Sequence, residues 1–79
     1  MIDLENKTFK LSDNKEYEVI EHIEYNSKTY VYLVNINDKL DSVFKEIKKI
    51  DNEYYIDDID KELFKKEIIN KFINKINED

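Results

Sequence analysis

The chain has 79 residues, a net charge of −6 at pH 7 and charged side chains at 41% of its positions. It contains no cysteine and no glycine, which excludes disulfide bonds, thiolate metal sites and glycine-rich phosphate-binding loops. The negative charge argues against direct binding to nucleic acid or to membrane surfaces, and it indicates a protein partner with a basic surface. We expect no cofactor.

The first third of the chain predicts short antiparallel strands. Residues 8–11 read as a strand, residues 12–14 as a turn and residues 17–25 as a second strand. The alternation of the second strand slips at Val19 and Ile20, which predicts a twist or a bulge. Asn26 and Ser27 then have the length of a two-residue hairpin loop.

The run at residues 29–36 is apolar on both faces of a strand. Tyr30, Tyr32, Val34 and Ile36 share one parity, whereas Val31 and Leu33 share the other. One helix can cover only one of these faces. The other face is closed by a curled sheet, shielded by loops or left as an aromatic binding surface, and which face the helix covers stays open.

Residues 40–50 fit two patterns. Leu40, Val43, Phe44 and Ile47 recur at helical spacing, but lysines alternate with apolar residues from Val43 onward, as in an edge strand. We favour a strand. The aromatic, β-branched residues 54–56 predict another strand after a turn at residues 51–53.

A C-terminal helix is predicted over about 61–76. Asp60 can cap it, Ile59 and Phe64 sit at the positions of a hydrophobic staple, and apolar residues recur at every fourth position from Phe64. The predicted fold is therefore α+β, an antiparallel sheet of four to five strands with one helix packed on one face. We expect one domain over 1–79, with the sheet at about 6–57.

From Phe9 onward the chain resembles small acidic proteins of unknown function from low-GC Gram-positive bacteria and their phages, including the YrzB-like proteins. The resemblance rests on residues 16–20, residues 25–30 leading into 33–35, and Asp57-Asp58 before the helix. Ser27 stands where such relatives usually carry glycine. The resemblance implies an α+β fold, no assigned chemistry and a strand at residues 42–50.

The richness in Ile, Lys, Asn and Tyr, with no Ala, Arg, Gly or Pro, indicates AT-rich coding DNA. We therefore expect a low-GC bacterium or its phage as the source. No stretch has the pattern of a signal peptide or the length of a membrane span, so we expect a cytoplasmic protein.

No catalytic or metal site is predicted. His22 is the only histidine. One histidine without cysteines does not make a zinc site, and no serine can be assigned to it as a catalytic nucleophile. The acids of residues 57–62 lack the spaced ligands and turn glycine of a calcium loop, and helix capping explains them. We therefore predict that the protein is not an enzyme.

Tyrosine and acidic side chains are the candidates for binding a partner. Tyrosine combines a large contact area with a polar tip and is common at protein interfaces. Glu16, Glu18 and Glu24 share a parity on the second strand and can steer a basic partner or resemble nucleic acid, although packing of the rings and a solvated acidic face explain the same residues. The predicted partner-binding residues are Tyr30, Tyr32, Tyr54, Tyr55, Glu16, Glu18, Glu24, Asp57 and Asp58.

These observations favour a non-enzymatic acidic protein-binding module. The most specific hypothesis is an inhibitor encoded by a phage or mobile element, anti-CRISPR or similar anti-defence, that acts on a nucleic-acid-handling host protein. The alternative is a chromosomal accessory protein, or a homodimeric interaction module, with a housekeeping partner.

Overall fold

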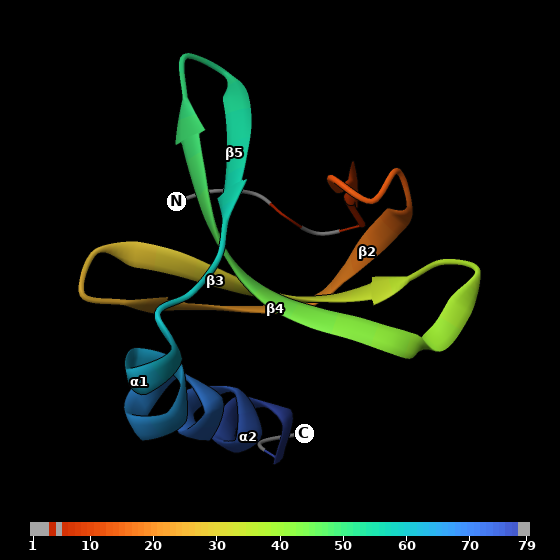
Figure 1. The fold of residues 1–79 in the computed structure, drawn as a ribbon. Helices are drawn as coiled ribbons and strands as arrows, with labels where there is room; N and C mark the ends of the chain where they lie inside the picture. The colour runs from red at the N-terminus through yellow and green to blue at the C-terminus, as the bar shows by residue number, and fades with distance from the viewer. Residues whose placement is uncertain (1–3, 5, 78–79) are drawn as a thin grey trace.

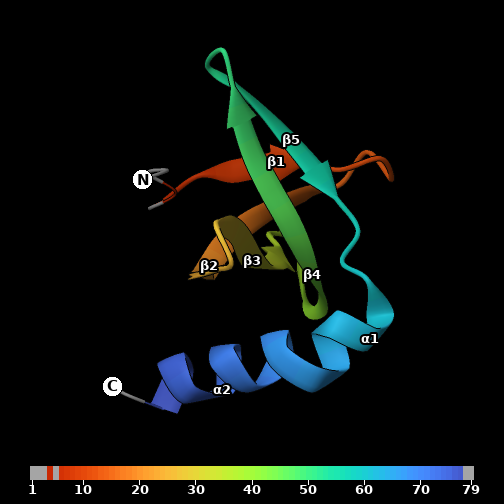
Figure 2. The ribbon, with the colours of Figure 1, turned by 90° about the vertical axis from the view of Figure 1, so that its left-hand side faces the viewer.

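The computed structural model describes residue 4 and residues 6–77. Five strands form one antiparallel sheet in the order β1-β2-β3-β4-β5, and a helix runs along one side of it (Figures 1 and 2). This confirms the predicted α+β fold and the strand at residues 40–50. The elements are β1 (Thr8–Lys10), β2 (Glu16–Tyr25), β3 (Lys28–Asn35), β4 (Asp38–Ile50), β5 (Glu53–Asp57), α1 (Lys61–Leu63), a π-helical turn η1 (Phe64–Ile68) and α2 (Ile69–Asn77).

The sheet curls, and β3 is buried on both faces. Figure 2 shows β1 and β5 above β2 and β3, with the helix below them. Val31 and Leu33 are fully buried inside the curl, and the rings of Phe9 in β1 and Tyr54 in β5 meet edge to face with centroids 5.2 Å apart. A curled sheet is therefore what closes the second face of β3. The inner core consists of Leu4, Tyr17, Val31, Leu33 and Ile47, with Phe9, Leu11, Val19, Val43, Tyr54 and Ile56 packed around it.

A second core lies between the sheet and the helix. Tyr30 in β3 is 1% exposed there, and Ile68 and Phe72 of the helix are fully buried. Phe44 of β4 joins the two layers, because its ring centroid lies 4.7 Å from that of Tyr32 and 5.0 Å from that of Phe72. The helix thus covers the tyrosine face of β3.

A bulge at Ile20 allows β2 to contribute to both cores. Val19 lies opposite Leu33 and Glu21 lies opposite Tyr32, so Ile20 is an extra residue in the ladder. Because of it, odd-numbered residues of β2 face the inner core before the bulge and the helix after it. Tyr17 belongs to the inner core and Ile23 to the helix-side core, although a regular strand would place both on one face.

Two of the hairpins close through two-residue loops in which both residues have positive φ angles, although neither residue is glycine. Asn26 and Ser27 have φ angles of 52° and 64°, and Asp51 and Asn52 have φ angles of 51° and 68°. Loops with positive φ at both positions match the twist of the strands they connect, and asparagine adopts that region more readily than most residues. Ser27 adopts it as well, which confirms the predicted hairpin.

The helix begins as predicted, at the Asp60 cap, whose carboxylate accepts a hydrogen bond of 3.0 Å from the Leu63 backbone N–H. Apolar residues at every fourth position drift about 40° around an ideal α-helix at each step. The wider π-helical turn offsets this drift between Phe64 and Ile68, so that Ile68 and Phe72 are both fully buried. Ile76, one step further along, is 50% exposed.

Candidate functional site

One end of the helix-side sheet face stays uncovered, where β2 begins and β3 ends. Glu18 lies directly opposite Val34, on the side of the sheet that carries Tyr30 and Tyr32. Ile36 donates its backbone N–H to the Glu16 carbonyl over 3.1 Å. We call this surface the acidic–isoleucine face, and it consists of Glu16, Glu18, Ile20, Val34 and Ile36.

The acidic–isoleucine face combines exposed apolar surface with two exposed carboxylates, and Lys10 of β1 lies opposite Glu16 at its border. Ile20 and Ile36 are each 49% exposed, and Val34 is half-buried. Among the residues that the structure describes, neither Glu16 nor Glu18 forms an ion pair. Contiguous exposed apolar side chains mark a candidate interaction surface, and carboxylates beside them are complementary to positive charge.

Most of the predicted tyrosines belong to the two cores. Tyr30 is buried and Tyr32 is half-buried against Phe44. Tyr54 is half-buried against Phe9 at the inner core. Tyr55 is 46% exposed, and its hydroxyl donates to Glu53 over 3.1 Å. A tyrosine surface made of these four rings therefore does not form on the folded chain.

The predicted acidic residues do not form one surface. Because the bulge intervenes, Glu24 lies opposite Thr29 on the other face of the sheet from Glu18, which corrects the shared face expected from their parity. Asp57 lies 3.6 Å from the Lys48 ammonium. Asp58 forms an ion pair with Lys45, and hydrogen bonding to that ammonium holds the pKa of Asp58 below its usual range. Glu16 and Glu18 are thus the predicted acids that lie together.

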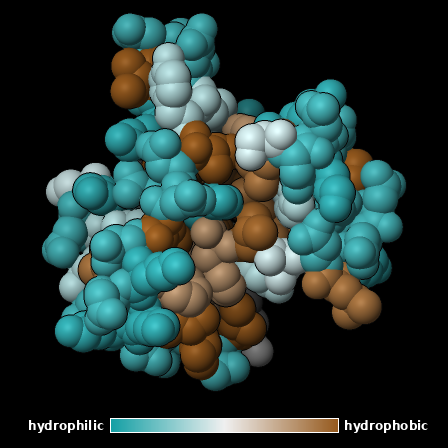
Figure 3. Space-filling view, in the orientation of Figure 1, coloured by the Kyte–Doolittle hydropathy of each residue, from teal (hydrophilic) through white to brown (hydrophobic). Residues whose placement is uncertain are grey.

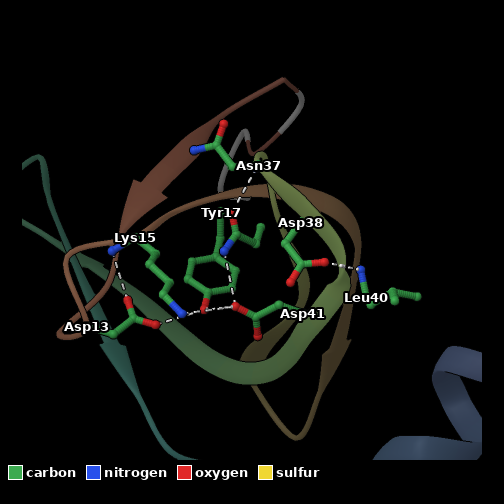
Figure 4. A network of polar contacts seen from close by, with 8 residues as sticks. Asp13, Lys15, Tyr17, Asn37, Asp38, Leu40 and Asp41 are labelled. Carbon is green, nitrogen blue, oxygen red and sulfur yellow. Dashed lines mark hydrogen bonds and ion pairs between the residues drawn. The ribbon is translucent and has the colours of Figure 1, made fainter.

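A polar network closes one end of the curl, around the hydroxyl of Tyr17 (Figure 4). That hydroxyl lies 2.8 Å from Asp13 Oδ2 and 2.8 Å from Asp41 Oδ2, and it donates its single proton to one carboxylate at a time. The Asn35 side-chain amide donates to Asp41 Oδ2 over 3.1 Å, and the Lys15 ammonium stands 3.9 Å from the same oxygen. The network ties the β1–β2 turn to the start of β4.

The electrostatics of this network favour a structural role over a role in proton transfer. Hydrogen bonds from the Lys15 backbone and from Tyr17 lower the pKa of Asp13, and those from Asn35 and Tyr17 lower the pKa of Asp41. Hydrogen bonding to Asp13 and then to Asp41 raises the pKa of Tyr17 well above its usual value. A protonated phenol between two ionised carboxylates neither accepts nor releases a proton near neutral pH.

The substitution Asp41→Asn is expected to change how stability depends on pH. A carboxyl whose native pKa is lowered stabilises the fold above its unfolded pKa of about 3.9, and this stabilisation is lost as the pH falls through the native value. We expect the wild type to melt above Asp41→Asn at pH 6, and the gap to shrink between pH 4 and pH 2. Thermal unfolding followed by circular dichroism measures this, and a gap that is constant over that range would contradict the role of Asp41.

Two further features concern chemistry and membranes. In residue 4 and residues 6–77, no cluster of three or more His, Asp or Glu side chains is arranged to hold a metal ion. Within the same residues, no helix combines the length and the hydrophobicity needed to cross a bilayer.

The sequence pattern did not single out Ile20, Val34 and Ile36 as an exposed group. Val34 and Ile36 continue the parity of Tyr30 and Tyr32, so they read as part of the surface covered by the helix. The bulge at Ile20 was the available signal, because the extra residue of a bulge is left unpaired in the ladder and interrupts the regular alternation.

Comparison of the chain with protein-family models, with curated proteins and with solved structures found no match. The resemblance to YrzB-like proteins therefore stays a prediction.

Proposed function

We propose that the protein is a non-enzymatic binding module that docks on a basic surface of a partner protein through the acidic–isoleucine face. The observation that carries the proposal is the pairing of exposed Ile20 and Ile36 with the unpaired carboxylates of Glu16 and Glu18 on one uncovered end of the sheet. The isoleucines supply apolar area to bury, and the carboxylates steer the encounter.

The specific form of the proposal is inhibition of a nucleic-acid-handling protein by a chain of phage or mobile-element origin. Proteins that bind nucleic acid line their grooves with lysine and arginine, because those side chains neutralise phosphates. A small chain of net charge −6 with an acidic docking face competes for such a groove. The location in the cytoplasm and the phage origin are part of this proposal.

The same face is poorly suited to a symmetric homodimer. In a two-fold interface each surface patch meets its own copy. The four carboxylates of Glu16 and Glu18 from the two chains would then be gathered in one interface, and like charges held close together are destabilising. A basic partner removes this repulsion, which favours a heterologous complex.

Reversal of the charge on this face is the direct test. The immobilised wild-type chain is used to capture partners from a bacterial lysate, and each captured protein is purified and its binding kinetics are measured at 50 and 300 mM salt. The double substitution Glu16→Lys/Glu18→Lys is expected to slow association at least tenfold at low salt, and to abolish its salt dependence, because steering by charge acts on the association rate.

The matched control adds the same charge elsewhere. Glu24→Lys/Glu67→Lys changes two exposed acids that lie away from the acidic–isoleucine face, and we expect an association rate within about twofold of the wild type. Equal slowing by both variants would refute docking through this face. The inhibitor form requires in addition that the chain displaces nucleic acid from the partner, and a stable ternary complex would refute it.

A further inference from the structure

The edge of β4 is unpaired over its first half. β4 spans 13 residues and pairs with β3 from Asp38 to Ile47, but the five residues of β5 pair only with Glu46–Ile50. Asp38–Lys45 therefore has a neighbouring strand on one side only. Such an edge offers unpaired N–H and C=O groups to an added strand.

The hairpin fixes which groups point outward. In an antiparallel ladder the backbone groups of successive residues point alternately to the two edges. In the hairpin closed by Asp51 and Asn52, the backbone N–H and C=O groups of Glu46 point toward β5. Phe44 and Ser42 lie two and four residues before Glu46, so their backbone groups point to the same side, beyond the end of β5. Within the described residues, the backbone groups of Ser42 and Phe44 have no partner on that side.

A cavity of about 360 Å³ lies beside this edge, between β4 and the start of the helix. Its apolar wall comes from Val43 and Phe44 of β4, Ile59 before the helix and Phe64 at the π-helical turn. Figure 3 shows hydrophobic side chains gathered between hydrophilic groups over the middle of this side of the molecule. The cavity is large enough for one bulky apolar side chain.

The rim of the cavity is cationic, although the chain as a whole is acidic. Lys61 and Lys65 line it, both are exposed, and they stand one turn apart on the helix. In the part of the chain that the structure describes, neither lysine forms an ion pair, whereas the third lysine of the lining, Lys45, pairs with Asp58. Two ammonium groups without an acidic partner beside an apolar cavity favour a ligand that carries a carboxylate.

We propose that the Ser42–Lys45 edge of β4 binds an extended peptide of a partner protein as an added strand. Ser42 and Phe44 supply the backbone hydrogen bonds, and a bulky apolar side chain of the peptide enters the cavity. Side chains two residues apart on a strand share a face at a spacing of about 6.6–6.8 Å, so a carboxylate two positions from the apolar residue lies against Lys61 and Lys65. The recognised pattern is apolar-x-acidic.

A second copy of the chain is a poor occupant of this edge. Two β4 edges that pair about a two-fold axis would place both helices on the same side of the joined sheet, with the two sets of Lys61 and Lys65 flanking one seam. The four ammonium groups would repel one another, whereas an acidic peptide neutralises them. This site adjoins the acidic–isoleucine face but is distinct from it in residues and in charge.

The test uses the full chain and synthetic peptides. The probe is the fluorescein-labelled, amidated hexapeptide Thr-Thr-Phe-Thr-Glu-Thr, and fluorescence anisotropy measures its dissociation constant. The control peptide Thr-Thr-Phe-Glu-Thr-Thr has the same composition but places Phe and Glu on opposite faces of the strand. We expect the control to bind at least tenfold more weakly, and equal binding by the two peptides would overturn the proposal.

Two further changes separate strand addition from adhesion to an apolar hole. Two N-methylated probes are compared. In one the backbone nitrogen of the residue before Phe is methylated, and in the other the backbone nitrogen of Phe. We expect at least tenfold weaker binding of one of the two, because only one of these N–H groups donates to β4. On the protein, Lys61→Glu/Lys65→Glu is expected to weaken binding about tenfold. Lys49→Glu/Lys66→Glu, outside the cavity lining, is expected to leave it within twofold.

Measurements on the protein without peptide test whether a second copy of the chain occupies the β4 edge. Sedimentation equilibrium is expected to show a monomer, and amide exchange at Ser42 and Phe44 is expected to slow when the probe binds. A dimer in which these amides are already protected would assign the edge to a second copy and overturn the proposal. Because Glu16→Lys/Glu18→Lys is expected to keep full affinity for the probe, failure of this inference and failure of the proposed docking face are distinguishable.

Discussion

Leu33→Lys is expected to abolish folding, whereas Val34→Lys, one residue further along the same strand, is expected to leave stability within about 1 kcal/mol of the wild type. Leu33 is fully buried inside the curl. A lysine there must lose its hydration or its proton, because the described side chains of the inner core are aliphatic or aromatic. The cost of several kcal/mol approaches the whole stability of about 4–12 kcal/mol expected for a chain of this length.

Val34→Lys serves as the matched control, because it tests the same charge on the opposite face. Val34 is half-buried at the end of the sheet that the helix leaves open, and it lies directly opposite Glu18. A lysine at this position reaches water and gains a cross-strand partner of opposite charge. Urea denaturation followed by circular dichroism compares the two variants. A cooperative transition of Leu33→Lys near that of the wild type would mean that the curl is open to water.

The local features of the fold could be predicted because short-range chemistry determines them. Asp60 at the helix start, the two-residue loop at Asn26 and Ser27 and the bulge at Ile20 each depend on neighbours within a few residues. The pattern of residues 29–36 predicted that one helix covers only one face of this strand and left three alternatives for the other face, which the curled sheet closes.

Which residues pack on each face of β3 depends on contacts between segments that are distant in the sequence. The inner face of β3 is covered by Leu4, Phe9, Tyr54 and Ile56, which come from both ends of the sheet and lie in segments too short to show a periodic pattern. Their position follows from the curl of the sheet, which no single strand encodes.

The candidate site was predicted in part, and the tyrosines show why. Tyrosine suits a core edge and an interface equally well, because the ring is apolar and the hydroxyl is polar. Tyr30 lies in a core and Tyr55 on the surface, although both occur in aromatic, β-branched strands. The sequence pattern could not separate them, because burial depends on where the helix lies. Glu16 and Glu18 were placed correctly at the surface, since charged side chains are rarely buried.

Phe72→Ala is expected to destabilise the fold by about 3–5 kcal/mol, the range typical of a large aromatic side chain removed from a core. Phe72 is fully buried, and its ring centroid lies 5.0 Å from that of Phe44 in β4. The cavity left behind would loosen the helix, and the faces of Tyr30 and Phe44 would lose their cover. Because β3 is the shared wall of both cores, we expect the sheet and the helix to unfold together in one transition.

Ile73→Ala, at the next residue of the helix, separates the loss of core packing from the change in helix propensity. Ile73 is 47% exposed, so its removal is expected to cost less than about 1 kcal/mol, offset in part by the higher helix propensity of alanine. Urea titrations that follow helix content at 222 nm and tyrosine fluorescence test whether the two layers report one midpoint. If the helix signal of Phe72→Ala disappears well before the tyrosine signal, the sheet is stable without its helix, and the inner core alone accounts for the fold.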